Sequence, residues 1–158
     1  MQSAVTGGFF HHAAMVLKER FDDNKDDVFL YEAVGNGVIC GSWKENKCEI
    51  GPGKKIEMIC VRKLICNRDK EFMDKAIVFM GEALNHKYSL KSLFNRHKKS
   101  EVGALEPEND FSPMYVEKDR PFFCSELVVK AYKILGVLNN EESSSSFLPS
   151  NLENNDAL

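Results

Sequence analysis

The sequence predicts an α+β domain with a small antiparallel sheet and two main helices. Apolar segments rich in aromatic and β-branched residues favour strands over residues 9–17, 28–34 and 56–64. Apolar residues then recur at helical spacing in two later segments, 69–84 and 125–135. A run of strands followed by a run of helices is typical of the α+β class.

The first half of the chain is expected to form the sheet. Residues 9–17 are almost continuously apolar, which predicts a strand that is buried on both faces or nearly so. The charged stretch 18–27, rich in Asp and Asn, predicts a loop. After the aromatic strand 28–34, the Gly-Asn-Gly turn at 35–37 and the extended segment 38–40 complete a hairpin-like unit.

The second half is expected to contribute the helices and a flexible end. The first helix runs for roughly four turns from about Asp69. Gly136 follows the second helix, where a left-handed C-terminal cap is usual. The serine run 143–146 and the last residues, 153–158, predict a flexible tail, and residues 147–149 between them are expected to dock on the domain.

Length and composition fit one ordinary domain. The chain has 158 residues, of which 43% are hydrophobic, so we expect a single domain over residues 1–152. The net charge of -3 and the scattered basic residues argue against a nucleic-acid-binding face. No apolar run approaches the ~20 residues that span a bilayer, and residues 1–8 lack signal-peptide features. We therefore expect a cytoplasmic protein without a transmembrane segment.

The cysteines do not form a recognisable framework. The chain has five, an odd number, and no CxxC pair occurs. This pattern predicts neither a disulfide scaffold nor a zinc ribbon, and no metal or other cofactor is expected. The default role of each cysteine is that of a small buried hydrophobic residue, so a chemical role must be indicated by the surroundings.

Cys124 has such surroundings. It follows two phenylalanines and directly precedes the second helical stripe, which places its sulfur at a helix N-terminus. The unpaired N–H groups and the positive end of the helix dipole stabilise a thiolate there, and reactive cysteines use this location to lower their pKa below ~8.5. The same N–H groups can form part of an oxyanion hole. Position alone favours a buried cysteine, so a nucleophile also requires a base.

Four histidines are the candidate bases. His86 and His97 lie in polar segments and are expected to be solvated on the surface. His11 and His12 lie inside the first predicted strand, where neighbouring side chains point to opposite faces, so one of them can face the second helix. Two alanines follow and would allow a close approach of that helix. Periodicity does not decide between His11 and His12, and a hydrogen-bonded core histidine is the alternative role.

A third group usually orients the imidazole in such a pair, and Glu32 is the candidate. It lies in the otherwise apolar strand 28–34, where a carboxylate is costly unless it is paired. The alternative is an edge-strand position with the Glu32 side chain in water, and the residue pattern suits both equally.

These segments, in the order His, Glu, Cys, resemble a circularly permuted papain-like family, the NlpC-type thiol hydrolases. The closest likeness is to the YiiX-like branch, which is related to lecithin:retinol acyltransferase-like proteins. Residues 123–128 (FCSELV) match the family's YCSELV pattern, and residues 32–38 (EAVGNGV) match EAxGxGV. Residues 12–17 (HAAMVL) resemble the histidine strand HVGIV, which selects His12 over His11. Residues 149–152 (PSNL) resemble a PSDL-like element that ends the domain, so this part of the tail is expected to be ordered.

The resemblance implies a permuted papain-like fold and a cysteine-dependent hydrolase of the amidase or peptidase type. Cys124 would be the nucleophile, His12 the base and Glu32 the group that orients His12, with an amide or ester as substrate. Family members usually carry a further strand before the histidine strand. This sequence has only residues 1–8 there, so the strand is missing or truncated, and a protein partner could complete that edge.

Two other functions are compatible with the same residues. One is a catalytically inactive papain-like domain that serves as a structural or interaction protein in a larger assembly. The other is a lipid deacylase or acyltransferase, against which the lack of a transmembrane anchor argues mildly. A sulfur close to His12 beside an open groove favours the enzyme, and a buried sulfur or a filled groove favours the interaction protein.

Overall fold

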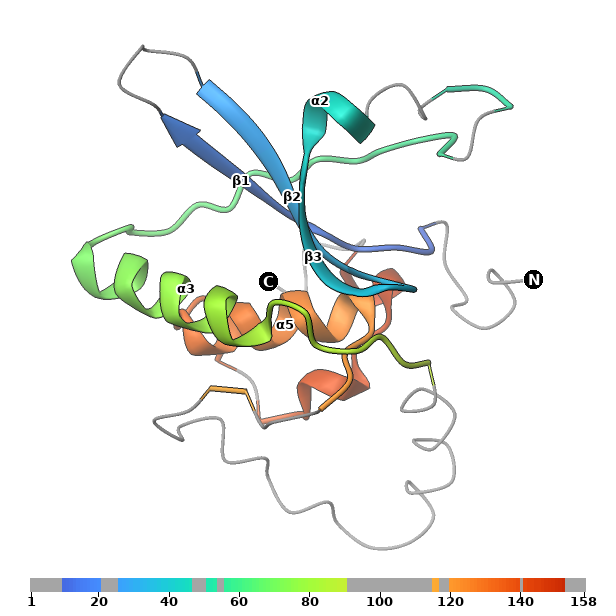
Figure 1. Cartoon of the computed structure of the whole chain (residues 1–158). Coiled ribbons are helices and arrows are strands. Elements are labelled where there is room, and N and C mark those ends of the chain that lie inside the picture. The colour runs from blue at the N-terminus through green and yellow to red at the C-terminus, as the bar shows by residue number, and fades with distance from the viewer. Residues whose placement is uncertain are drawn as a thin grey trace, which may run out of the picture.

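The protein is described from a computed structural model, and Figure 1 shows its architecture. The structure describes the following residues: 10–20, 26–46, 51–53, 56–90, 115–116, 120–139 and 141–152. A three-stranded sheet lies over a long helix near the C-terminus, and a second long helix packs beside that helix (Figure 1). The predicted α+β class, with a small antiparallel sheet and two main helices, is confirmed.

The sheet is antiparallel with the order β1-β2-β3. β1 spans Met15–Arg20, β2 spans Asp26–Val34 and β3 spans Gly37–Ser42. β2 is therefore the central strand. Its predicted extent, 28–34, is correct to within two residues, and the turn at residues 35–36 joins it to β3 as the sequence predicts.

The first strand does not lie where its apolar run predicts. Residues 10–14 have no regular structure, and β1 continues into residues 18–20, which the charge pattern assigned to a loop. The ladder forms because backbone groups pair with β2 whatever the side chains are, as in Glu19 opposite Asp27. Val16 is half exposed, so burial of this strand on both faces was also wrong.

The predicted strand at 56–64 is not part of this sheet. Apart from a single bridge at Ile56, residues 57–69 have no regular secondary structure. Met58 and Val61 are exposed by more than half. The alternation of apolar residues was therefore a misleading signal, because a segment without a paired neighbouring strand does not form a ladder.

The two long helices follow the predicted positions closely. α3 spans Lys70–Ala83 and is capped by Asp69, whose carboxylate accepts the N–H of Phe72 at 2.9 Å. α5 spans Cys124–Ile134, and Gly136 has a φ of 69° just after it, as expected for a C-terminal cap. A single turn, α2 (Trp43–Asn46), follows β3. None of the described helices combines the length and the apolar character that a bilayer crossing requires.

The core lies between the sheet and the two long helices. Tyr31 and Val38 from the sheet meet Phe79 of α3 and Leu127 of α5 in one buried cluster. The end of α3 is docked on β3, because Asn85, which has a φ of 67°, donates its N–H to the carbonyl of Val38 at 2.9 Å. These contacts fix α5 against the inner face of β2.

The C-terminal segment is more ordered than the serine run predicts. Residues Ser144–Ser146 and Pro149–Leu152 form two 3-10 helices, η2 and η3, that contact α5. Ser144 is fully buried, so the prediction of a flexible 143–146 was wrong. The predicted docking of 147–149 is confirmed, since Phe147 is only 6% exposed. Residues 153–158, also predicted to be flexible, lie outside the described residues.

Candidate functional site

Cys124 is the first residue of α5, as the sequence predicts. The chain that leads into it is held by backbone bonds to the segment after α3: Phe122 donates to Lys87 at 2.9 Å and accepts from Ser89 at 3.1 Å. The thiol is nearly buried, with 4% of the residue exposed. Cys124 is thus fixed at the buried N-terminal end of α5.

His12 lies in the irregular chain just before β1, and Glu32 lies near the C-terminal end of β2. The imidazole Nε2 is 2.6 Å from a carboxylate oxygen of Glu32. The His12 side chain is 44% exposed, whereas that of Glu32 is 13% exposed. Glu32 is therefore a paired, mostly covered carboxylate on the central strand, and the alternative of an edge position in water was wrong.

The structure brings His12 and Cys124 into interaction. Burial tends to lower the pKa of His12, but its hydrogen bonds to Cys124 and Glu32 and their charges raise it to about 9. Burial tends to raise the pKa of Cys124, and the hydrogen bond and positive charge of His12 lower it below its ordinary value. Each group thus favours the charged form of the other, which is the condition for a thiolate–imidazolium pair.

Backbone groups also act on the pKa of the Cys124 thiol. Hydrogen bonds from the backbone of Ala13 and Ser125 lower the pKa of Cys124, so they stabilise the anion and must be N–H donors. One donor follows His12 in the chain, and the other is in the first turn of α5. The helix-start position predicts the Ser125 contact, whereas the Ala13 contact could not be foreseen because the region around His12 is irregular.

The ring geometry of His12 assigns a role to each nitrogen. Nε2 is engaged by Glu32, which leaves Nδ1 as the ring nitrogen that can accept the proton of a thiol. A carboxylate accepts hydrogen bonds, so Nε2 carries a proton. Glu32 therefore selects the tautomer in which Nδ1 can take the Cys124 proton.

The other histidines differ from this arrangement. His11 is exposed, and His97 lies outside the described residues. His86 was predicted to be solvated, but its Nδ1 is 2.9 Å from the carbonyl oxygen of Arg120, and its ring lies 5.9 Å from that of Phe122. The prediction for His86 was therefore wrong.

Tyr88 is a neighbour of the site that the sequence did not indicate. Burial raises its pKa, and the charge of Cys124 raises it further. The segment 87–89 pairs with Phe122, which explains how a tyrosine so distant in sequence comes near Cys124. No motif marks Tyr88, so sequence reasoning had no signal for it.

Other site types find little support in the described part of the chain. No group of three or more potential metal ligands occurs there, and none of its four cysteines forms a disulfide. One surface hollow, of about 540 Å³, lies along α3. A second, of about 310 Å³, lies between the N-terminal end of α3 and the C-terminal end of α5. Neither is lined by Cys124, His12 or Glu32.

Comparison of this chain with family models, curated proteins and solved structures finds no match.

Proposed function

We propose that this protein is a cysteine-dependent hydrolase of the amidase or peptidase type, with Cys124 as nucleophile, His12 as base and Glu32 as the orienting group. One observation carries the proposal: Cys124, at the start of α5, and the His12 imidazole, which a carboxylate holds at 2.6 Å, each shift the pKa of the other toward its charged form. A nucleophile, a base and an orienter in a single chain of contacts are the usual parts of covalent acyl-transfer catalysis.

The first half-reaction forms a thioacyl enzyme. His12 takes the proton of Cys124, and the thiolate attacks the substrate carbonyl carbon to form a C–S bond. The carbonyl electron pair moves to oxygen, and the N–H groups at the start of α5, including that of Cys124, stabilise this oxyanion. The tetrahedral intermediate collapses with cleavage of the C–N bond, and the His12 imidazolium gives its proton to the leaving amine.

The second half-reaction releases the product. His12 takes a proton from water, and the resulting hydroxide attacks the thioester carbon. The C–S bond breaks, the acid leaves, and the Cys124 thiolate and His12 imidazolium are restored. Glu32 accepts the hydrogen bond from Nε2 throughout and stabilises the imidazolium. For an ester substrate, the leaving group is an alcohol and the steps are otherwise the same.

The proposed fold is a circularly permuted papain-like domain of the NlpC type, in which the base precedes the nucleophile in sequence. The order of the three groups along the chain and their source in two strand-region segments and one helix start support it. The likeness of residues 123–128 and 32–38 to the YiiX-like patterns supports it further.

An interaction protein built on the same fold is the second candidate. The observation that favours it is the low exposure of Cys124, at 4%, which limits the approach of a substrate carbonyl to the sulfur. The exposed His12 side chain favours the hydrolase instead, because it leaves one side of the His12–Cys124 pair open to solvent.

Trapping of the acyl enzyme tests the proposal. The protein is incubated with an activated amide and an activated ester, and the adduct is located by mass spectrometry. We expect an acyl group on Cys124 that hydroxylamine removes, and none in the His12→Ala variant. An adduct from the ester alone that passes to a lipid acceptor would instead identify an acyltransferase.

The control is Cys60, an exposed cysteine on the irregular segment before α3. Acylation at Cys60 equal to that at Cys124, or no adduct at either, would reject the hydrolase and leave the interaction protein.

A further inference from the structure

The candidate site has two halves that come from different parts of the chain. His12 lies just before β1 and Glu32 lies in β2, whereas Cys124 is the first residue of α5. Catalysis by such a pair requires the halves to stay in register, because a shift of about 1 Å can cost ~10²-fold in rate. A contact network that joins the sheet to the start of α5 would therefore act directly on the site.

Such a network begins on β3, next to the Glu32 half. Val38 is the partner of Ala33 in the ladder, and Ala33 is the neighbour of Glu32. The N–H of Val38 donates to the carbonyl of His86 at 2.8 Å. Gly37 allows this approach, because a Cβ there would lie 2.6 Å from the same carbonyl oxygen.

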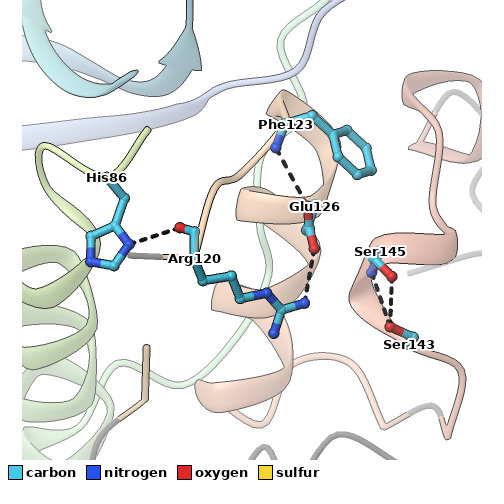
Figure 2. Close-up of polar contacts among 6 residues, drawn as sticks. All are labelled: His86, Arg120, Phe123, Glu126, Ser143 and Ser145. Carbon is cyan, nitrogen blue, oxygen red and sulfur yellow. Dashed lines mark hydrogen bonds and ion pairs between the residues drawn. The ribbon is translucent and has the colours of Figure 1, made fainter. Parts of the chain in front are cut away.

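The network continues through side chains to the residue before Cys124, as Figure 2 shows. The ring of His86 points at the carbonyl oxygen of Arg120, at 2.9 Å from Nδ1. A carbonyl only accepts, so Nδ1 of His86 carries a proton. The guanidinium of Arg120 turns toward Glu126, at 3.0 Å, and the other carboxylate oxygen of Glu126 accepts the N–H of Phe123 at 3.4 Å.

The ion pair in this network is shielded from water. The Glu126 side chain is 1% exposed and that of Arg120 is 15% exposed. A buried carboxylate is retained only when it is paired, and this one reaches back from the first turn of α5 to the N-cap backbone. This buried ion pair fixes the direction of the chain just before Cys124 more firmly than an exposed helix cap would.

We propose that His86, Arg120 and Glu126 form a positioning relay that holds the Cys124 end of α5 in register with the sheet that carries Glu32. The three residues act through the backbone of 120–123 and do not touch the reacting atoms. The inference rests on the proposed function for its consequence in catalysis, whereas the relay itself is a property of the fold.

Two substitutions of His86 separate the effect of its Nδ1 donor from the effect of the space that its ring fills. His86→Phe keeps a ring beside Phe122 but removes the Nδ1 donor, and His86→Asn restores an amide donor near the Nδ1 position. We expect His86→Phe to lower the alkylation rate of Cys124 at neutral pH by about tenfold, within the range that small misplacements cause. The pH at which Cys124 ionises should rise, and His86→Asn should return both quantities toward the wild type.

Glu82→Gln is the matched control, since the Glu82 carboxylate also accepts a backbone N–H, that of Val116 at 3.1 Å, but has no link to Cys124 in the relay. It should leave the Cys124 pH profile unchanged even if it lowers stability. A wild-type profile in His86→Phe, or a profile in His86→Asn no better than in His86→Phe, would overturn the relay. Glu126→Gln is a second variant if it folds, and we expect it to change the alkylation rate and the pH profile of Cys124 in the same direction as His86→Phe.

Failure of the proposed function has a different signature. If Cys124 in the wild type reacts no faster than Cys60, the hydrolase fails, and amide hydrogen exchange over residues 123–127 decides the relay. Faster exchange in His86→Phe that His86→Asn reverses supports the relay. Equal exchange in the two variants overturns it.

Discussion

The thiol of Cys124 and the imidazole of His12 each change the proton affinity of the other. The pKa of His12 is about 9 because hydrogen bonds and charges from Cys124 and Glu32 outweigh the lowering effect of burial. The pKa of Cys124 falls for the reciprocal reason, although its burial acts in the opposite direction. At neutral pH both shifts favour the ion pair, so a single-residue change at either group must be visible at the other.

Replacing the thiol tests this coupling without any substrate. In Cys124→Ser the negative partner of the imidazole is lost, so we expect the pKa of His12 to fall below about 9. An NMR titration of the His12 ring resonances measures it. Cys60→Ser should leave the titration unchanged, and an unaltered His12 titration in Cys124→Ser would contradict the coupling.

Glu32 gives a second test at the same scale. Glu32→Gln preserves an oxygen for Nε2 of His12 but removes the charge and allows the wrong tautomer. We expect turnover to fall by up to about 10⁴-fold, the cost of the analogous change in serine-enzyme triads. Steady-state kinetics with the substrate found by acyl trapping measures it, and comparable turnover in Glu32→Gln would remove Glu32 from the site.

The helices of this fold could be predicted from the sequence more accurately than its strands. Helices α3 and α5 were predicted well because their apolar stripes and the Gly136 cap after α5 are local signals. The strands were predicted less well because a ladder depends on a distant partner: β1 includes charged residues 18–20, and the apolar segment 56–64 has no place in the sheet. His12 was selected by resemblance to a motif, since its surroundings are irregular.

The junction of β3 with the end of α3 makes a prediction for stability. Gly37 has a φ of 117° and no room for a Cβ, which would lie 2.6 Å from the carbonyl oxygen of His86. We expect Gly37→Ala to lower the free energy of unfolding by about 1–3 kcal/mol, the usual cost of such backbone strain. Urea denaturation measures the change.

Gly35→Ala, two residues away, is the control. A Cβ at Gly35 meets nothing within 4 Å, so we expect a change within about 0.5 kcal/mol. Equal effects of the two substitutions would show that the β3 approach to His86 is not tight.

Taken as a whole, the molecule places three groups from three segments at one point where the sheet meets α5. Composition, periodicity and capping predicted the class of the fold and the helix start at Cys124. They did not predict the Ala13 contact, the nearness of Tyr88 or the His86–Arg120 contact, because each joins residues that are far apart in sequence or lie in irregular chain. The relay and the site are therefore properties of tertiary packing.

The pH dependence of alkylation at Cys124, in the wild type and in His12→Ala, tests the central claim most directly. Modification at each cysteine is followed by mass spectrometry with Cys60 as the internal reference. We predict that Cys124 in the wild type ionises at a pH below the ~8.5 of an ordinary thiol, and that His12→Ala moves this transition upward. A transition at the ordinary pH, or one that His12→Ala leaves in place, would contradict the thiolate–imidazolium pair.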